Sequence, residues 1–180
     1  MVVVLMMITY TAPLLMAKLS IIIGLPGSGK SHLLKEMVIA KQIEEDCIYH
    51  DFHADAYNNS ERVTGSRYYR SLVDNLTAGR NCAVADIAFC KGERLQEFIE
   101  EISEAVPNVF VDIKYFKNDP ETCKNNVLRS AETSASDRTN KILEFTAGYE
   151  VPEGANSLSV YRVPPVNGCR CVLSDEDSVE

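Results

Sequence analysis

Blocks of apolar residues separated by polar breaks predict strands and helices that alternate along this 180-residue chain. Residues 19–23 form a short, β-branched, apolar run that is typical of a buried parallel strand, and residues 30–43 carry apolar side chains at helical spacing. The same patterns predict strands at 47–50, 82–85, 109–116 and 157–163, and helices at 66–79, 92–107, 119–129 and around 142–149. This alternation predicts an α/β fold with a mainly parallel five-stranded sheet covered on both faces.

The most specific motif lies between the first predicted strand and the first predicted helix. Residues 24–31, GLPGSGKS, match G-x-x-x-x-G-K-[ST] at every fixed position. A glycine-rich turn backed by a helix N-terminus forms a concave site for the β-phosphate of a nucleotide. We expect Lys30 to reach the β- and γ-phosphates and the Ser31 hydroxyl to bind Mg²⁺.

This motif narrows the predicted fold to a P-loop NTPase, a three-layer α/β/α sandwich with a short helical lid, and predicts ATP and Mg²⁺ as cofactors. The residues expected to bind the nucleotide are Gly24, Leu25, Pro26, Gly27, Ser28, Gly29, Lys30, Ser31 and His32.

Two aspartates stand at the ends of predicted strands. Asp51 follows the second strand and Asp86 the third, and the carboxyl ends of parallel strands face the ligand crevice. We expect Asp51, or alternatively Asp55, to act as the catalytic base toward an acceptor hydroxyl. Asp86 is expected to bind Mg²⁺ or to orient the substrate. A strand-end turn residue is the alternative interpretation of Asp51 and Asp86.

Two pairs of arginines complete the candidate site. Arg129 and Arg138 flank the small, polar stretch 130–136, which is predicted to be a mobile lid, and they would act with Lys30 on the charge that develops at the γ-phosphate. Arg67 and Arg70 lie one helical turn apart and could bind a phosphate on the acceptor. For both pairs an ordinary solvated surface is the alternative.

From about residue 19 to residue 163, the chain resembles the P-loop kinases of the polynucleotide kinase and zeta-toxin type. This group includes the 5′-hydroxyl polynucleotide kinases of tailed phages. The resemblance is carried by GLPGSGKS, by YHDF at 49–52, by ADIAF at 85–89 and by YEVP at 149–152. It implies that Asp51 is the general base and that Arg129 and Arg138 are the lid arginines. It further implies an ATP-dependent kinase whose hydroxyl acceptor is a polynucleotide 5′-end or a modified nucleotide.

The net charge of -8 leaves other acceptors open, because an acidic surface does not favour nonspecific binding of long nucleic acid. The alternatives are a small-metabolite or nucleoside kinase of the same superfamily, and a non-catalytic P-loop interaction protein, against which Asp51 argues. The expected partners are a nucleoside triphosphate and a hydroxyl acceptor (a nucleic-acid end, a nucleotide or a small metabolite), with no membrane and no obligate protein partner.

The termini and the cysteines bear on organisation and compartment. We expect residues 1–15 to be an N-terminal extension, 16–173 to form one P-loop kinase domain and 174–180 to be an acidic tail. The six cysteines show no C-x-x-C spacing, which favours free buried thiols and a cytoplasmic protein. Cys169 and Cys171 form a C-x-C pair, a weak metal or redox alternative.

Overall fold

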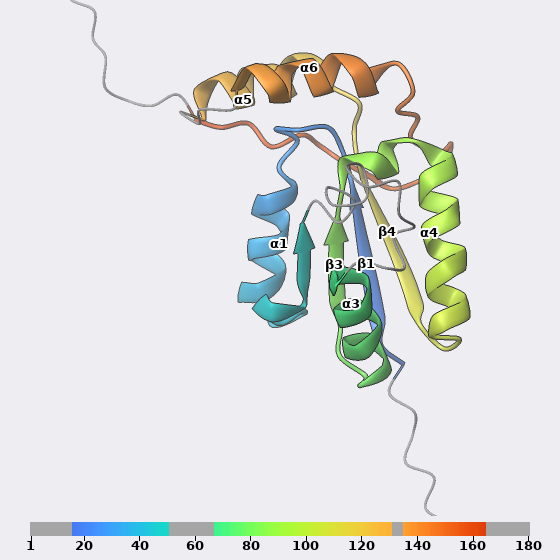
Figure 1. Cartoon of the computed structure of the whole chain (residues 1–180). Coiled ribbons are helices and arrows are strands. Elements are labelled where there is room, and N and C mark those ends of the chain that lie inside the picture. The colour runs from blue at the N-terminus through green and yellow to red at the C-terminus, as the bar shows by residue number, and fades with distance from the viewer. Residues whose placement is uncertain (1–15, 51–66, 131–134, 165–180) are drawn as a thin grey trace, which may run out of the picture.

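A computed structural model of the chain describes residues 16–50, 67–130 and 135–164 (Figure 1). Five strands in this part form one parallel sheet, in the order β2-β3-β1-β4-β5. The strands are β1 (Lys18–Ile23), β2 (Ile48–His50), β3 (Cys82–Ala85), β4 (Phe110–Phe116) and β5 (Ser157–Leu158). The predicted α/β fold with a parallel five-stranded sheet is confirmed.

Helices lie on both faces of this sheet. They are α1 (Lys30–Ile39), α3 (Arg67–Thr77), α4 (Gly92–Ala105), α5 (Pro120–Arg129) and α6 (Ala135–Thr146), with short 3₁₀ turns η1 (Glu45–Cys47) and η3 (Ile87–Cys90). Ile22 of β1 packs in one apolar cluster with Leu34 of α1, whereas Ile21 belongs to a second cluster with Leu72 of α3 and Phe98 of α4. The alternating side chains of β1 therefore contribute to two apolar clusters, one on each face of the sheet, between the sheet and its two layers of helices.

The central strand positions the glycine-rich loop. β1 lies between β3 and β4, and its side chains at positions 19 and 21–23 are fully buried. Figure 1 shows α5 and α6 lying across the carboxyl end of the sheet, above the turn from β1 to α1. The loop thus lies at the middle of the sheet edge where ligands bind in folds of this kind.

The first helix is shorter than its apolar pattern indicates. α1 ends at Ile39, because Lys41 takes the left-handed conformation with φ 53°. The Lys41 N–H donates to the Val38 carbonyl at 2.9 Å and the Gln42 N–H donates to the Met37 carbonyl at 2.9 Å. This is the Schellman pattern, which closes a helix by satisfying its last carbonyls.

The last strand is also shorter than the predicted 157–163, since β5 covers only Ser157–Leu158. The chain leaves the sheet because the Tyr161 N–H donates to the Ser28 carbonyl at 2.9 Å and the following residues bond to α5. The apolar alternation after β5 therefore serves packing on the glycine-rich loop, not extension of the sheet.

Three smaller predictions concern the start of α5, the start of the second strand and the state of the cysteines. The start of α5 is confirmed, since Asp119 caps it and Pro120 is its first residue. The second strand begins one residue later than predicted, because Cys47 belongs to η1. The four cysteines of the described part, Cys47, Cys82, Cys90 and Cys123, are buried free thiols, as expected.

Several expectations lie outside the described residues. They are the N-terminal extension 1–15, the acidic tail 174–180, the cysteine pair at 169 and 171, and the two candidate bases at 51 and 55. Across 16–50, 67–130 and 135–164, no helix combines the length and hydrophobicity needed to cross a bilayer.

Candidate functional site

The glycine-rich loop connects β1 to α1 and depends on its glycines for conformation and for space. Gly27 has φ 80° and Gly29 has φ 109°, which are conformations that side chains other than glycine rarely adopt. A Cβ on Gly29 would lie 2.7 Å from the Tyr161 Cβ, and one on Gly24 would lie 2.7 Å from the Ser28 Oγ. Any larger residue at these positions would distort the loop.

Lys30 lies against the start of this loop. Its Nζ donates to the Gly24 carbonyl at 2.6 Å and to the Leu25 carbonyl at 3.0 Å. Ser31 follows it in the first turn of α1 with an exposed side chain, at the helix end that carries positive partial charge. The Lys30 ammonium and the Ser31 hydroxyl thus come from the first two residues of α1, next to its N-terminus.

Asp86 lies beside the foot of the loop. It follows β3, whose Ala85 pairs with Ile22 of β1, and its side chain is buried. Its Oδ1 accepts a hydrogen bond from the Ala88 N–H at 2.7 Å, as the turn-residue interpretation predicts, and its role toward Mg²⁺ or the substrate stays a prediction. Carboxylate and hydroxyl oxygens are ligand types that Mg²⁺ accepts, so the chemistry of Asp86 and Ser31 fits the expected ion.

The buried thiol of Cys90 is affected by the charges of Lys30 and Asp86. Burial raises its pKa to about 11, while the positive charge of Lys30 and a hydrogen bond with the Gly24 backbone oppose that rise. The charge of Asp86 raises the pKa further. The charges of Lys30 and Asp86 therefore shift the pKa of this buried thiol in opposite directions.

One residue that the sequence analysis missed, Asn126, holds the loop from outside. Asn126 of α5, only 5% exposed, donates from Nδ2 to the Gly27 carbonyl at 2.9 Å and to the Tyr161 carbonyl. Its Oδ1 accepts from the Val163 N–H at 3.1 Å. A polar residue on the helix face shared with the buried Cys123 is the signal that could have found it.

The predicted lid arginines occupy different positions. Arg129 has an exposed side chain and donates to the Val163 carbonyl at 2.9 Å, beside the segment that packs on the loop. Arg138 is half-buried in α6, and the stretch between the two arginines includes residues 131–134, outside the described residues. Their expected role at the γ-phosphate stays a prediction.

The predicted acceptor arginines belong to α3, which packs on the face of the sheet opposite α1. Arg67 is the first residue of α3, and Arg70 is exposed on the same helix. Segment 51–66, which precedes α3 in the sequence, lies outside the described residues. The expected role of Arg67 and Arg70 toward the acceptor therefore stays a prediction. The same holds for the catalytic base expected at Asp51.

His32 lies on the outer side of the loop's helix. Its Nε2 is 3.3 Å from the Glu36 Oε1, and its ring centroid is 4.3 Å from that of Tyr161. Tyr161 in turn contacts the backbone of the loop at Ser28. His32 and Tyr161 therefore form an aromatic pair beside the loop.

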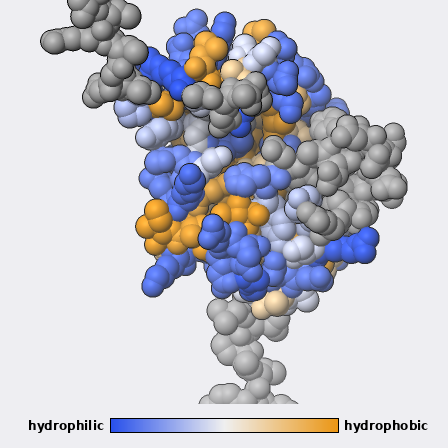
Figure 2. Space-filling model, turned by 60° about the vertical axis from the view of Figure 1, so that its left-hand side comes forward, coloured by the Kyte–Doolittle hydropathy of each residue, from blue (hydrophilic) through white to orange (hydrophobic). Residues whose placement is uncertain are grey.

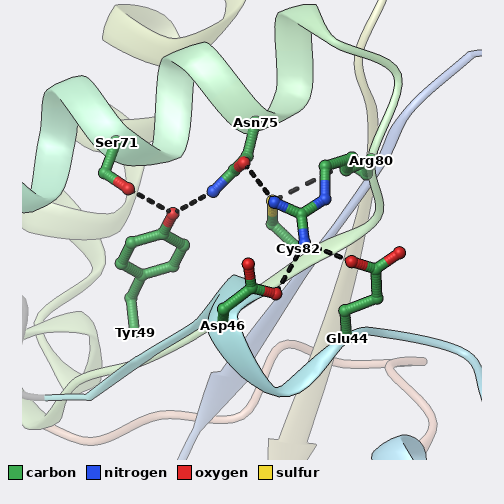
Figure 3. Close-up of polar contacts among 7 residues, drawn as sticks. All are labelled: Glu44, Asp46, Tyr49, Ser71, Asn75, Arg80 and Cys82. Carbon is green, nitrogen blue, oxygen red and sulfur yellow. Dashed lines mark hydrogen bonds and ion pairs between the residues drawn. The ribbon is translucent and has the colours of Figure 1, made fainter.

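A chain of polar contacts fixes the short edge strand β2 (Figure 3). The Tyr49 hydroxyl bonds with Ser71 at 3.0 Å and accepts from Asn75 at 2.8 Å, both on α3. Arg80 donates to Asn75 at 2.7 Å and pairs with Asp46 at 2.6 Å. The hydrogen bond from Arg80 lowers the pKa of the Asp46 carboxyl. These contacts anchor the strand that leads to the candidate base.

A groove of about 500 Å³ runs between α1 and β2, from Ser31 to the far end of both elements. Leu34, Val38 and Ile48 line it with apolar side chains, and His50 also lines it. Figure 2, turned so that the α1 side comes forward, shows an apolar patch on this face. The volume is in the range of small-molecule sites.

Comparison with known proteins gives a family and two similar proteins. A family model described as an AAA domain matches residues 19–152. An uncharacterized protein, R277, of Acanthamoeba polyphaga mimivirus is 29% identical over 135 residues, which cover 73% of this chain and 83% of that protein. The crystal structure of a gluconokinase from Sinorhizobium meliloti 1021 is similar with a TM-score of 0.48 and 14% identity, over 82% of this chain and 84% of that one.

Proposed function

The chain belongs to the AAA domain family, and from this premise we propose that it is an ATP-dependent kinase that transfers the γ-phosphate to a hydroxyl acceptor. The family and the loop support the broader description, a kinase-like P-loop nucleotide-binding protein. The observation that supports the kinase proposal is the glycine-rich loop at the end of the central strand, where Lys30 bonds to the Gly24 and Leu25 carbonyls and the buried Asp86 follows the neighbouring strand β3.

Each group at the loop has a role in phosphoryl transfer. The loop N–H groups and the N-terminus of α1 would bind the phosphates, and Lys30 would stabilise the charge that develops on them. Ser31 and Asp86 would hold Mg²⁺, which would neutralise negative charge on the phosphates. Asp51, three residues after Ile48 begins β2, would accept the proton of the acceptor hydroxyl.

The acceptor is the finer part of the proposal. The resemblance to polynucleotide kinases favours a polynucleotide 5′-hydroxyl or a modified nucleotide. The groove that begins at Ser31 favours a small-molecule alcohol instead, because its lining is largely apolar and its volume is about 500 Å³. The net charge of -8 supports the small molecule too.

The test is transfer of label from γ-labelled ATP to a panel of 5′-hydroxyl DNA, 5′-hydroxyl RNA, nucleosides and sugars. We expect one class to be labelled by the wild-type protein. The Lys30→Ala variant should lose about ten- to hundredfold in ATP affinity, because hydrogen bonds to charged groups contribute about 1.5–3 kcal/mol. Lys124→Ala, which removes the same charge from an exposed position on α5, is the matched control.

The outcomes separate the alternatives. Labelling of the nucleic acids alone would support the polynucleotide kinase, and labelling of nucleosides or sugars would support the small-molecule kinase. ATP binding by the wild type, lost in Lys30→Ala, without label on any acceptor would favour the non-catalytic interaction protein and overturn the kinase proposal.

A further inference from the structure

We propose that Asn126 is a positioning residue for the phosphate loop, and that its side-chain amide joins α5, the loop and segment 161–163 into one unit prepared to bind phosphate. The functional part of this inference rests on the nucleotide binding proposed above. Its structural part rests only on contacts among described residues.

The first step concerns the peptide groups of the loop. In a trans peptide the carbonyl and the N–H of the same unit point in opposite directions. The Tyr161 N–H holds the Ser28 carbonyl at 2.9 Å, so the Gly29 N–H of that peptide points away from segment 161–163. An N–H fixed in this way needs no reorganisation when an anion arrives.

The second step concerns how Tyr161 is itself held. Asn126 donates to the Tyr161 carbonyl and accepts from the Val163 N–H, so it bonds to the segment on both sides of residue 162. The same amide donates to the Gly27 carbonyl at 2.9 Å. One buried side chain thus binds the loop directly and also binds the segment that orients the Ser28 carbonyl.

The third step is that the partners dictate which way the amide faces. Carbonyls only accept hydrogen bonds and a backbone N–H only donates, so Nδ2 must face Gly27 and Tyr161 while Oδ1 faces Val163. Both donors of Asn126 are then used. A carboxylate of the same shape would face two carbonyls with no proton to donate, and the contacts with Gly27 and Tyr161 would both be lost.

The loop has little room to adjust around this contact. A Cβ on Gly27 would lie 3.0 Å from Val127 Cγ2 and 3.2 Å from the Cys123 carbonyl carbon, so the backbone of α5 lies directly over the loop. Gly27 also has φ 80°. The loop therefore cannot shift to find other donors for the Gly27 carbonyl. Loss of the Asn126 contacts should loosen the loop and segment 161–163 together.

The test compares Asn126→Asp with Asn125→Asp, the neighbouring change on the exposed face of α5. In the nucleotide-free protein, hydrogen exchange should quicken tenfold or more in peptides covering 24–31 and 159–164 for Asn126→Asp only. Affinity for ATP and ADP should fall at least tenfold, whereas affinity for AMP, which has no β-phosphate, should change less than twofold. Lowering the pH should restore part of the loss, because a protonated carboxyl donates one hydrogen bond.

Unchanged exchange and unchanged ATP affinity in Asn126→Asp would overturn the inference. An equal loss of ATP and AMP affinity, together with faster exchange throughout the protein, would assign Asn126 a purely structural role and overturn it as well. If Asn126→Asp does not fold, Asn126→Ala removes the same donor without adding charge and is judged by the same criteria. If the wild type binds no nucleotide, the proposed function fails, and the exchange data alone still decide whether Asn126 holds the loop.

Discussion

Replacing Tyr149 with Phe should destabilise the protein through the loss of one buried hydroxyl. Tyr149 is 2% exposed, and its single hydroxyl proton is shared between the Phe116 carbonyl and the Ile23 carbonyl, which lies 3.3 Å from the hydroxyl oxygen. These carbonyls end β1 and β4, immediately before the phosphate loop and the approach to α5. The hydroxyl therefore joins two central strands at the edge where the site lies.

The magnitude follows from what the variant leaves behind. Phe keeps the ring and its packing, so the cost is that of leaving buried carbonyls without their donor, about 1–3 kcal/mol. For a domain of this size each kcal/mol lowers the melting temperature by about 2–4 °C. We expect a loss of about 2 kcal/mol, which corresponds to a decrease of about 4–8 °C in Tm.

The assay is urea unfolding with thermal melting at pH 7, with Tyr161→Phe as control because that tyrosine is 39% exposed. Burial raises the pKa of Tyr149 above its ordinary value of 10.0. Above that pH the unfolded chain loses the Tyr149 proton while the folded protein keeps it, so stability falls as pH rises. Tyr149→Phe should therefore lose less stability than the wild type between about pH 9 and pH 11.

A Tyr149→Phe protein as stable as the wild type would refute this reasoning, because the two carbonyls would then not depend on the hydroxyl. A Tyr161→Phe loss of the same size would also refute it, since burial would no longer distinguish the two positions.

Three further changes probe the loop and its cover. Gly27→Ala should cost at least about 1–2 kcal/mol, from its positive φ and the nearby α5 backbone, whereas Gly148→Ala, with open space, should melt near the wild type. Ser28→Ala should leave the free energy of unfolding unchanged or higher, because the Ser28 hydroxyl is buried without a partner among the described residues. Asp119→Ala should cost about 1 kcal/mol in urea unfolding by removing the α5 N-cap. The backbone hydrogen bond lowers the Asp119 pKa, so that difference should shrink as pH falls below 3.8.

The sequence predicts the centre of the fold well and its edges less well. β3 has the predicted bounds because four small or apolar residues in a row fit only a strand buried on both faces. The predicted end of α1 was wrong because Lys41 takes a left-handed conformation, and the sequence has no Gly there to indicate it. The predicted last strand was too long because the same alternation of apolar residues occurs in a strand that pairs with a sheet and in a segment that packs against a loop.

Part of the candidate site could be predicted from the sequence and part could not. The loop and Lys30 follow from a motif whose spacing reflects phosphate binding, and Asp86 follows from its place after a strand. Asn126 could not be predicted in its role, because its partners Gly27 and Tyr161 are distant in sequence and meet only in the folded chain. Its place on a buried helix face could mark it as unusual, but not name what it binds.

The central claim, that the loop serves phosphoryl transfer rather than nucleotide binding alone, is tested most directly by Asp51→Asn. The measurement is the ATP dissociation constant together with the rate of γ-phosphate transfer to the acceptor that the wild type labels. The account predicts ATP affinity close to that of the wild type and a transfer rate lower by about 10²–10⁴-fold, the usual contribution of a general base. Transfer at the wild-type rate by Asp51→Asn would contradict it.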